Sequence, residues 1–155
     1  MAGQVEKRLA DAGITLPAAP APVGNYVPAV VTGNLVFMAG QIPNRDGKLA
    51  HRGKLGADVS IEQGQEAAKI CAINILAQLK AAIGDLDRVR RCVRVGGFVN
   101  CTPEFADQAK VANGASDLLA LAFGDAGRHA RATVGQASLP LGAAVEIEAI
   151  FEISL

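Results

Sequence analysis

Residues 144–154 read AVEIEAIFEIS, and this stretch decides the architecture of the chain. Apolar residues at every second position alternate with a second set that contains Glu146, Glu148 and Glu152, which is the period of a β-strand with two different faces. One face of the resulting sheet is therefore expected to pack against helices, while the opposite face carries carboxylates.

A second strand is expected over residues 130–138, joined to the first by a turn around residues 139–142. This strand carries Arg131, fifteen residues before Glu146. Charges seldom lie inside an apolar sheet unless something pairs with them. An internal Arg131–Glu146 salt bridge would satisfy both groups. Alternatively, the guanidinium grips a small anionic ligand while the carboxylate handles a proton or a water. The spacing alone leaves both interpretations open.

Two long helices and three further strands complete the pattern. A capping box of Ser60 and Gln63 opens the first long helix, and Thr102 is expected to cap the second, with Pro103 in its first position. The strand over residues 35–39 is continuously apolar and is expected to be covered on both faces. The expected helices are 4–12, 61–83 and 102–123, and the expected strands are 26–31, 35–39, 89–99, 130–138 and 144–154.

This order of elements predicts an α+β sandwich, with one mixed β-sheet, two long helices on one face and a short N-terminal helix. Three prolines between residues 17 and 22 favour an extended arm after that helix. The chain of 155 residues is thus expected to comprise an N-terminal helix and Pro/Ala arm, residues 1–23, and one main domain, residues 24–155.

The amino-acid composition disfavours nucleic acid as a partner and favours self-association. Fifteen basic and fifteen acidic residues give a formal net charge of zero, so nothing favours binding to a phosphate backbone, and nucleic acid is not expected as a partner. Because half of the residues are apolar, an oligomer is expected to bury surface that a small monomer would expose.

The cysteines and the hydropathy favour the cytoplasm. Cys71, Cys92 and Cys101 have no CxxC spacing and are odd in number, which is typical of reduced thiols and favours neither a disulfide framework nor a zinc site. No apolar run approaches 18 residues, so no membrane span is expected, and the N-terminus lacks the apolar core of a signal peptide.

Five segments of the chain form a recognisable series: Gly24-Asn25-Tyr26, GNLVFMAGQIP at 33–43, ARATV at 130–134, Leu139-Pro140, and VEIEAI at 145–150. They resemble, in the same order, motifs of the RidA/YjgF family, whose members often carry the label "endoribonuclease L-PSP". The resemblance spans about residues 24–153.

The resemblance implies a chorismate mutase-like fold and a homotrimer with ligand sites in the clefts between subunits. It also implies hydrolysis of reactive enamine/imine intermediates, such as 2-aminoacrylate, to 2-keto acids and ammonia. Arg131 matches the residue that binds the substrate carboxylate, and Glu146 matches the residue that holds the attacking water. The backbone at Gly40 and Thr133 is expected to face the ligand, and Tyr26 is expected to line the cleft.

The departures from the family pattern place the chain in an outlying branch. Ala132 stands where the family usually has Ser, and Thr133 stands where it often has Cys. Three functions remain open: the imine deaminase, a non-catalytic trimeric binder of 2-keto acids or amino acids, and a ribonuclease, as the older family label suggests. Zero net charge and few aromatic residues disfavour the ribonuclease. An imine carbon is already electrophilic, so neither a metal nor a cofactor is expected.

Further polar residues have both a functional and a structural interpretation. His129 is two residues from Arg131 and could share its face and donate to a ligand, although a structural or solvated histidine is the alternative. Asn113 points either into the cleft or toward solvent, and His51 lies in a polar loop. Four arginines at the start of the 89–99 strand are interpreted as solvated or salt-bridged to acidic neighbours: Arg88, Arg90, Arg91 and Arg94.

Overall fold

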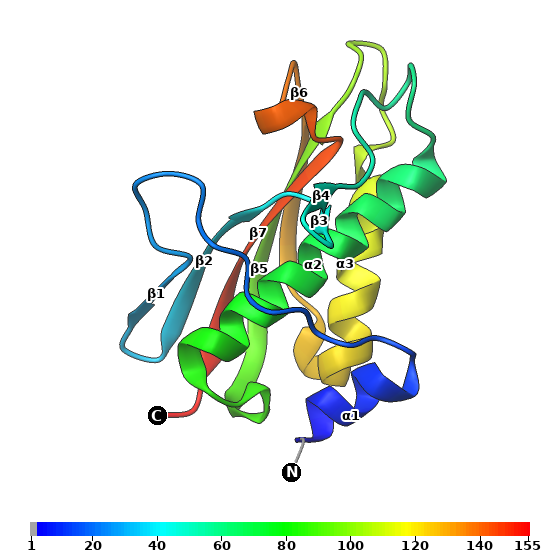
Figure 1. Ribbon diagram of the computed structural model, residues 1–155. Helices are drawn as coiled ribbons and strands as arrows, with labels where there is room; N and C mark the ends of the chain where they lie inside the picture. Colours follow the sequence, from blue (N-terminus) through cyan, green and yellow to red (C-terminus); the bar gives the residue numbers. More distant parts are fainter. Residues whose placement is uncertain (1–2) are drawn as a thin grey trace.

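A computed structural model describes residues 3–155, which form a sandwich of one mixed β-sheet and two long helices on one of its faces (Figure 1). Strands β5 and β6 run parallel and the other neighbouring pairs are antiparallel. The expected α+β architecture is thereby confirmed. Across the sheet the strands are β1 (Ala29–Thr32), β2 (Leu35–Gln41), β7 (Val145–Ile153), β5 (Val89–Asn100) and β6 (Ala130–Gln136), and the helices are α1 (Gln4–Asp11), α2 (Ile61–Ile83) and α3 (Gln108–Phe123).

The alternation in β7 produces the two-faced sheet that the sequence predicts. Five residues of β7 are buried at alternate positions, and the intervening side chains lie on the face without helices. Phe151, fully buried, meets Phe123 of α3 with the ring centroids 6.0 Å apart. Otherwise the core consists mainly of Ala, Val, Ile and Leu, so burial of small apolar side chains between sheet and helices stabilises the fold.

The expected pairing of the last two strands is wrong, because β5 lies between β6 and β7. α3 returns the chain parallel to β5, which places β6 on the outer edge of β5 and leaves the inner edge for β7. The short helical turn Pro140–Gly142 therefore belongs to a connection across the sheet and not to a hairpin. This arrangement separates Arg131 from Glu146 by one strand.

The second long helix begins at Gln108, five residues after the expected first position at Pro103. The N–H of Thr102 donates to the carbonyl of Leu55, next to the bridge between Leu55 and Cys101, and Phe105 then closes a turn onto Thr102. Pro103 therefore lies in this turn, ahead of the helix.

The first two strands also differ from expectation. The strand expected from residue 26 begins at Ala29, after Pro28, because proline has no N–H for the ladder. The strand over 35–39 is covered on one face only: Phe37 is 42% exposed, since residues 3–155 form no second layer over its face of the sheet.

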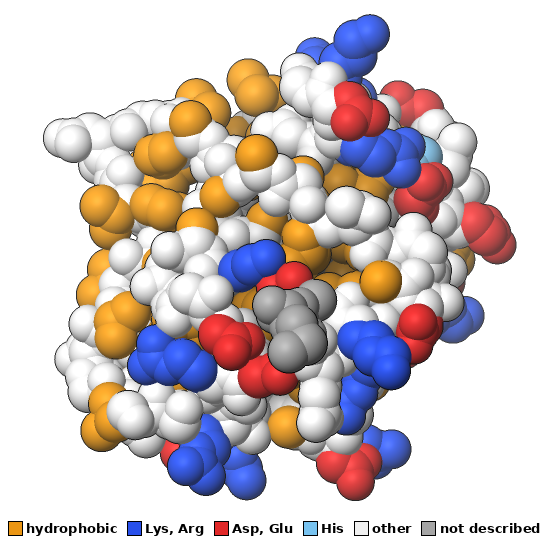
Figure 2. Space-filling view, turned by 60° about the horizontal axis from the view of Figure 1, so that its bottom comes forward, with side chains coloured by type: hydrophobic (Ala, Val, Ile, Leu, Met, Phe, Trp, Pro, Cys, Tyr) orange, Lys and Arg blue, Asp and Glu red, His pale blue; other side chains and the backbone are white. Residues whose placement is uncertain are grey.

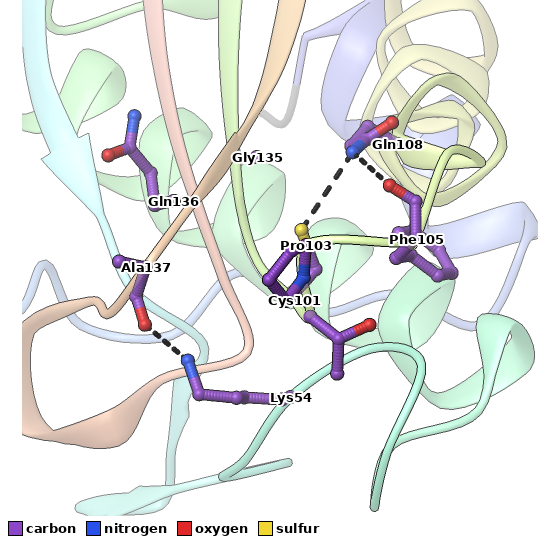
Figure 3. Close-up of a pocket in the computed structure, with 9 residues that line it drawn as sticks. Lys54, Cys101, Pro103, Phe105, Gln108, Gly135, Gln136 and Ala137 are labelled. Atoms are coloured by element: carbon purple, nitrogen blue, oxygen red, sulfur yellow. Dashed lines mark hydrogen bonds between the residues drawn. The ribbon is translucent and has the colours of Figure 1, made fainter.

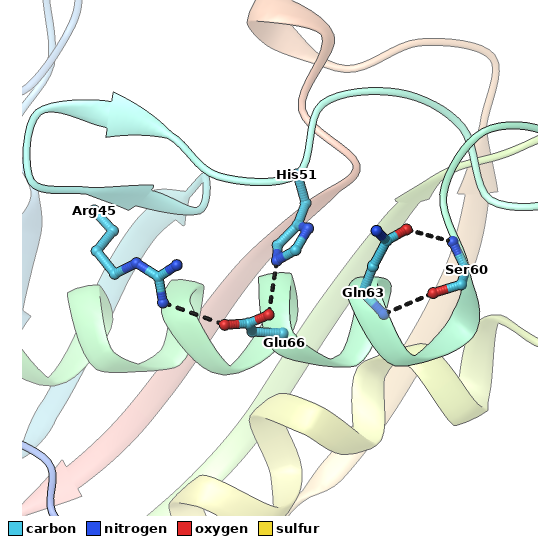
Figure 4. Close-up of polar contacts among 5 residues, drawn as sticks. All are labelled: Arg45, His51, Ser60, Gln63 and Glu66. Atoms are coloured by element: carbon cyan, nitrogen blue, oxygen red, sulfur yellow. Dashed lines mark hydrogen bonds and ion pairs between the residues drawn. The ribbon is translucent and has the colours of Figure 1, made fainter.

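The capping box at the start of α2 is confirmed. The backbone N–H of Ser60 donates to the Gln63 side chain over 2.9 Å, and the N–H of Gln63 donates to Ser60 Oγ over 3.1 Å (Figure 4). One turn farther along the helix, Glu66 binds Arg45 at 3.2 Å and His51 Nε2 at 2.9 Å, which ties the hairpin of β3 (Asn44–Arg45) and β4 (Lys48–Leu49) to α2. These two hydrogen bonds, that of His51 foremost, lower the pKa of Glu66.

The N-terminal helix packs on its own chain. Val5 and Leu9 are buried in the common core, and the carboxylate of Asp87 accepts from the N–H groups of Gln4 and Val5 at 2.8 and 2.9 Å. The following arm crosses α2, where the buried Gln78 amide donates to the carbonyl of Pro20 (Figure 1).

The arginines at the start of β5 have the structural role that the sequence favours. Arg91 pairs with Glu152 at 3.6 Å, Arg94 pairs with Glu148 at 3.3 Å, and Arg88 donates to the carbonyls of Ile83 and Ser154. Basic and acidic side chains are interspersed over the face at this end of the molecule, without a large area of one sign (Figure 2). No helix in residues 3–155 combines the length and apolar character needed to cross a lipid bilayer.

A glycine permits the close crossing of α2 and α3. A Cβ at Gly114 would lie 1.9 Å from the backbone carbonyl oxygen of Gln65.

A Gly→Ala substitution normally stabilises a helix interior by about 1 kcal/mol. Here we expect Gly114→Ala to lower the free energy of unfolding by about 1–3 kcal/mol or more, because the helices must separate. Denaturant titration against Gly64→Ala, whose neighbours are movable side chains at 3.0 and 3.1 Å, checks this. Equal stability of the two variants would contradict the account.

Candidate functional site

Arg131 lies on edge strand β6, and its guanidinium reaches α3. Nη1 donates to Asn113 Oδ1 at 2.9 Å and to Ser116 Oγ at 3.0 Å, and Nη2 donates to the carbonyl of Ala109 at 3.2 Å. These three acceptors recur at the spacing of one helix face, so α3 holds the guanidinium along its length.

The charge of Arg131 is not compensated within the described chain. All three acceptors are neutral, and no carboxylate of residues 3–155 lies within 4.0 Å of the guanidinium. A guanidinium has five N–H groups. The Nε–H and one Nη2–H remain without an acceptor in residues 3–155. These groups suit a planar oxyanion, and a carboxylate is the most compact partner for them.

His129 extends this network through Ser116. His129 Nδ1 lies 2.7 Å from the carbonyl of Gly127, which can only accept, so Nδ1 carries the proton. Nε2 of the neutral ring then accepts from Ser116 Oγ at 2.9 Å, and Ser116 in turn accepts from Arg131. Burial lowers the pKa of His129; the hydrogen bond to Gly127 opposes this shift, and the Arg131 charge adds to it. The histidine thus orients the hydroxyl that orients the guanidinium.

Thr133 follows Arg131 on the same side of β6. A Cβ at Gly97 would meet the Thr133 side chain at 3.1 Å and Ala112 of α3 at 3.4 Å, which places Thr133 between sheet and helix. Its Oγ1 is buried without a hydrogen-bond partner in residues 3–155. Such a hydroxyl normally binds a protein group or a water.

A second group of the expected residues lies around a cleft of about 430 Å³ beside the end of β2, which Gln78 of α2 also lines. Glu146, Gly40 and Tyr26 all line it, together with the end of β2, the turn at Pro140 and the arm. A Cβ at Gly40 would lie 2.7 Å from Glu146 Oε1, so the missing side chain makes room for the carboxylate. Tyr26 Oη accepts from the N–H of Val23 at 3.4 Å, which joins the ring to the arm.

The environment of Glu146 favours its protonated form. Burial raises the pKa of this carboxyl above its ordinary value, and the nearby Glu148 carboxylate adds to the shift. A carboxylate in this setting is a stronger base than one in water.

The structure therefore divides the expected residues into two groups, and the side chains of Arg131 and Glu146 leave opposite faces of one sheet. The α3 group comprises Arg131, Thr133, His129 and Asn113, and it also contains Ser116. The cleft group comprises Glu146, Gly40 and Tyr26. A Cβ at Gly96 would meet Glu148, whereas one at Gly97 would meet Thr133, so the two faces are distinct at this register. The interpretation of Arg131 and Glu146 as an internal salt bridge is wrong for the isolated chain.

Sequence reasoning missed Ser116. The signal was present, because Asn113 and Ser116 are three residues apart on one helix, which is the spacing of neighbours on a helix face. His51, by contrast, belongs to neither group. It binds Glu66 and helps to hold the β3–β4 hairpin against α2. Residues 3–155 contain no group of three or more His, Cys, Asp or Glu side chains arranged to hold a metal ion.

Comparison with known proteins agrees with the motifs and the fold. The family model described as "YjgF/chorismate mutase-like, putative endoribonuclease" matches residues 6–152. Protein TCP17 of Trypanosoma cruzi is 48% identical, over 98% of this chain and 96% of its own length. The 2-iminobutanoate/2-iminopropanoate deaminase of Dermatophagoides farinae is 31% identical, over 90% and 94%.

The same fold occurs in solved structures. The crystal structure of a protein of unknown function from Agrobacterium tumefaciens superposes with a TM-score of 0.90 at 52% identity, covering 97% of this chain and 92% of that one. With matching motifs, a family model over nearly the whole chain and a shared fold, the protein belongs to the YjgF/RidA family of chorismate mutase-like proteins.

Proposed function

We propose that the protein is an enamine/imine deaminase, which hydrolyses 2-aminoacrylate-type intermediates to 2-keto acids and ammonia. The observation that carries this proposal is the uncompensated Arg131 guanidinium, which neutral acceptors on α3 hold with two N–H groups free. These substrates carry a carboxylate beside the C=N bond, so a fixed guanidinium positions the reacting carbon. The relative named as a 2-iminobutanoate/2-iminopropanoate deaminase supports the same chemistry.

The reaction needs a water, a proton acceptor and a fixed imine. In the proposed mechanism Arg131 binds the carboxylate, and Glu146 takes a proton from water as the water oxygen attacks the carbon of the protonated imine. Glu146 then gives this proton to the nitrogen of the tetrahedral intermediate, and the C–N bond breaks to release ammonia. The hydroxyl proton returns to Glu146 as the carbonyl of the keto acid forms. Positioning and general base catalysis supply the acceleration.

We further propose a homotrimer in which each site combines the α3 group of one subunit with the cleft group of its neighbour. Arg131 and Glu146 lie on opposite faces of one sheet, so two copies are needed to bring them to one substrate. Apolar side chains on the face without helices support association: Val30 is 52% exposed, Phe37 is 42% exposed and Val134 is 47% exposed. A monomer would leave this apolar surface in water.

A non-catalytic binder of 2-keto acids or amino acids is the competing function, because the same guanidinium would hold their carboxylates. The deciding experiment generates 2-aminoacrylate in the presence of the protein and follows the release of ammonia and keto acid. The deaminase accelerates this release above the spontaneous rate. Binding of the keto acid without any acceleration would reject the deaminase in favour of the binder.

A further inference from the structure

A cavity of about 450 Å³ opens at the carboxyl-terminal ends of the parallel strands β5 and β6 (Figure 3). None of the residues expected to act in catalysis lines it. Phe105, Pro103 and Ala137 contribute apolar walls, while Lys54, Cys101 and Gln108 contribute polar atoms. Its volume lies within the range of about 300–1,000 Å³ that is usual for small-molecule sites.

Lys54 brings an uncompensated positive charge to this cavity. Its Nζ donates to Asn100 Oδ1 at 2.7 Å and to the carbonyl of Ala137, which uses two of its three N–H groups. No carboxylate of residues 3–155 lies within 4.0 Å of this ammonium. The acid nearest in sequence, Asp58, instead accepts from the backbone N–H of Lys54 at 2.6 Å.

The ammonium is also fixed in place before any ligand arrives. Asn100 is buried, and its own amide donates to the carbonyl of Ala143 at 3.1 Å, so the acceptor that holds Lys54 cannot turn away. A charged group that is already oriented loses little further conformational entropy on binding.

The opposite wall keeps the cavity open. A Cβ at Gly135 would lie 2.8 Å from Cys101 Sγ and 3.1 Å from Gln108 Nε2. Gln108 is itself fixed, because its amide donates to the carbonyl of Phe105 at 2.8 Å and contacts Cys101 Sγ at 3.8 Å. As the first residue of α3, Gln108 also marks the positive end of that helix dipole, which adds to the potential of Lys54.

We propose that this cavity is a second binding site, for a small monocarboxylate with an apolar body. The carboxylate pairs with the Lys54 ammonium through its third N–H, and the hydrocarbon part contacts Phe105, Pro103 and Ala137. This site is separate from the proposed deaminase site and does not depend on that activity. The alternative is that Lys54 only ties the loop of residues 50–59 to the ends of β5 and β6.

Cys101 offers a local readout on the intact protein. It is 8% exposed and lines the cavity, whereas Cys71 and Cys92 are 0% and 1% exposed. The probe is 4-methylpentanoate, and its uncharged isostere 4-methylpentanamide is the control. We expect the acid to slow labelling of Cys101 by a thiol reagent. The amide should bind roughly 10- to 100-fold more weakly, the factor for losing one charge-assisted hydrogen bond. Equal protection by acid and amide would overturn the proposal.

Variants locate the binding. Lys54→Met should abolish protection by the acid, Lys54→Arg should retain it, and Arg131→Ala should leave it unchanged. Protection that survives Lys54→Met, or that disappears in Arg131→Ala, would reject the assignment.

Gly135→Ala narrows the cavity while leaving both Lys54 bonds intact. Titration calorimetry of Gly135→Ala with 4-methylpentanoate, in the Arg131→Ala background that removes the other carboxylate site, should detect no binding. Affinity equal to that of Arg131→Ala alone would contradict the proposal even if Lys54→Met failed to fold.

Discussion

Arg131→Ala is expected to reduce kcat/KM for 2-aminoacrylate by roughly 30- to 5,000-fold, because loss of a hydrogen-bonded charge contact costs about 2–5 kcal/mol. The protein should remain folded. The guanidinium ends on the surface of α3, where Asn113 and the carbonyl of Ala109 can bind water after the substitution. Initial rates of ammonia release, with circular dichroism on the same samples, test this expectation.

Arg128→Ala is the matched control. Arg128 precedes β6 by two residues, and its side chain is 84% exposed, with one contact of 3.9 Å to Asp125. Arg128→Ala changes the net charge by the same amount as Arg131→Ala, at a position three residues away. It should leave kcat/KM within about twofold of the wild-type value, as is usual for surface substitutions. Full activity in a well-folded Arg131→Ala protein, or an equal loss in Arg128→Ala, would contradict the role given to Arg131.

Glu146→Gln is expected to have the second large effect, a loss of roughly 10²–10⁴ in kcat, the usual contribution of a general base. The side chain keeps its shape over Gly40, so the cleft survives and only proton transfer is removed. In the wild-type protein the rate should fall as the pH drops through the raised pKa of Glu146, because the protonated carboxyl cannot accept a proton. A pH–rate profile of both proteins tests this: the descending acid limb should be absent from the residual activity of the variant.

The same substitution should stabilise the protein near neutral pH. Because burial raises the pKa of Glu146 in the folded state, the stability that its protonated form contributes is present below the unfolded pKa. It is lost as the pH rises through the folded pKa. The neutral amide of Glu146→Gln avoids that loss of stability. The variant should therefore be more stable than the wild-type protein at pH 7, and this difference should vanish in acid. Thermal unfolding at several pH values measures this difference.

Glu148→Gln is the control for both effects. Glu148 lies on the same face of β7 but pairs with Arg94 at 3.3 Å. Its substitution should preserve most of the activity and should not raise stability. If Glu148→Gln lost as much activity as Glu146→Gln, the assignment of the base to Glu146 would be wrong.

Much of the fold was predictable because local chemistry and tertiary packing agree. The alternation in β7 and the capping box at Ser60 each have a single structural meaning, and both occur. The helix does not start at Thr102, because the N–H of this residue pairs with Leu55 and the chain then forms a separate turn from Thr102 to Phe105 before α3. The order of β5, β6 and β7 was mispredicted because sequence neighbours need not be neighbours in a sheet when a helix crosses between strands.

The sequence predicted which residues belong to the candidate site, but it did not predict how they are arranged in the fold. Arg131 and Glu146 follow from charges within strand patterns, and Gly40 follows from the family motif. Their separation in the fold depends on β6 lying parallel to β5 at the edge of the sheet, and no local sequence pattern encodes this placement. The spacing from Asn113 places Ser116 on the same helix face, but its hydrogen bonds to His129 and Arg131 are formed only in the folded chain.

The most direct test of the central claim is subunit complementation between two inactive variants, Arg131→Ala and Glu146→Gln. Mixed trimers are made by unfolding and refolding equal amounts together. If each site takes its arginine from one subunit and its glutamate from the next, about a quarter of the sites in a random mixture combine both intact residues. The mixture should therefore recover about a quarter of wild-type activity, while each variant refolded alone stays inactive. A mixture as inactive as its parents, in trimers shown to have exchanged, would contradict a site shared between subunits.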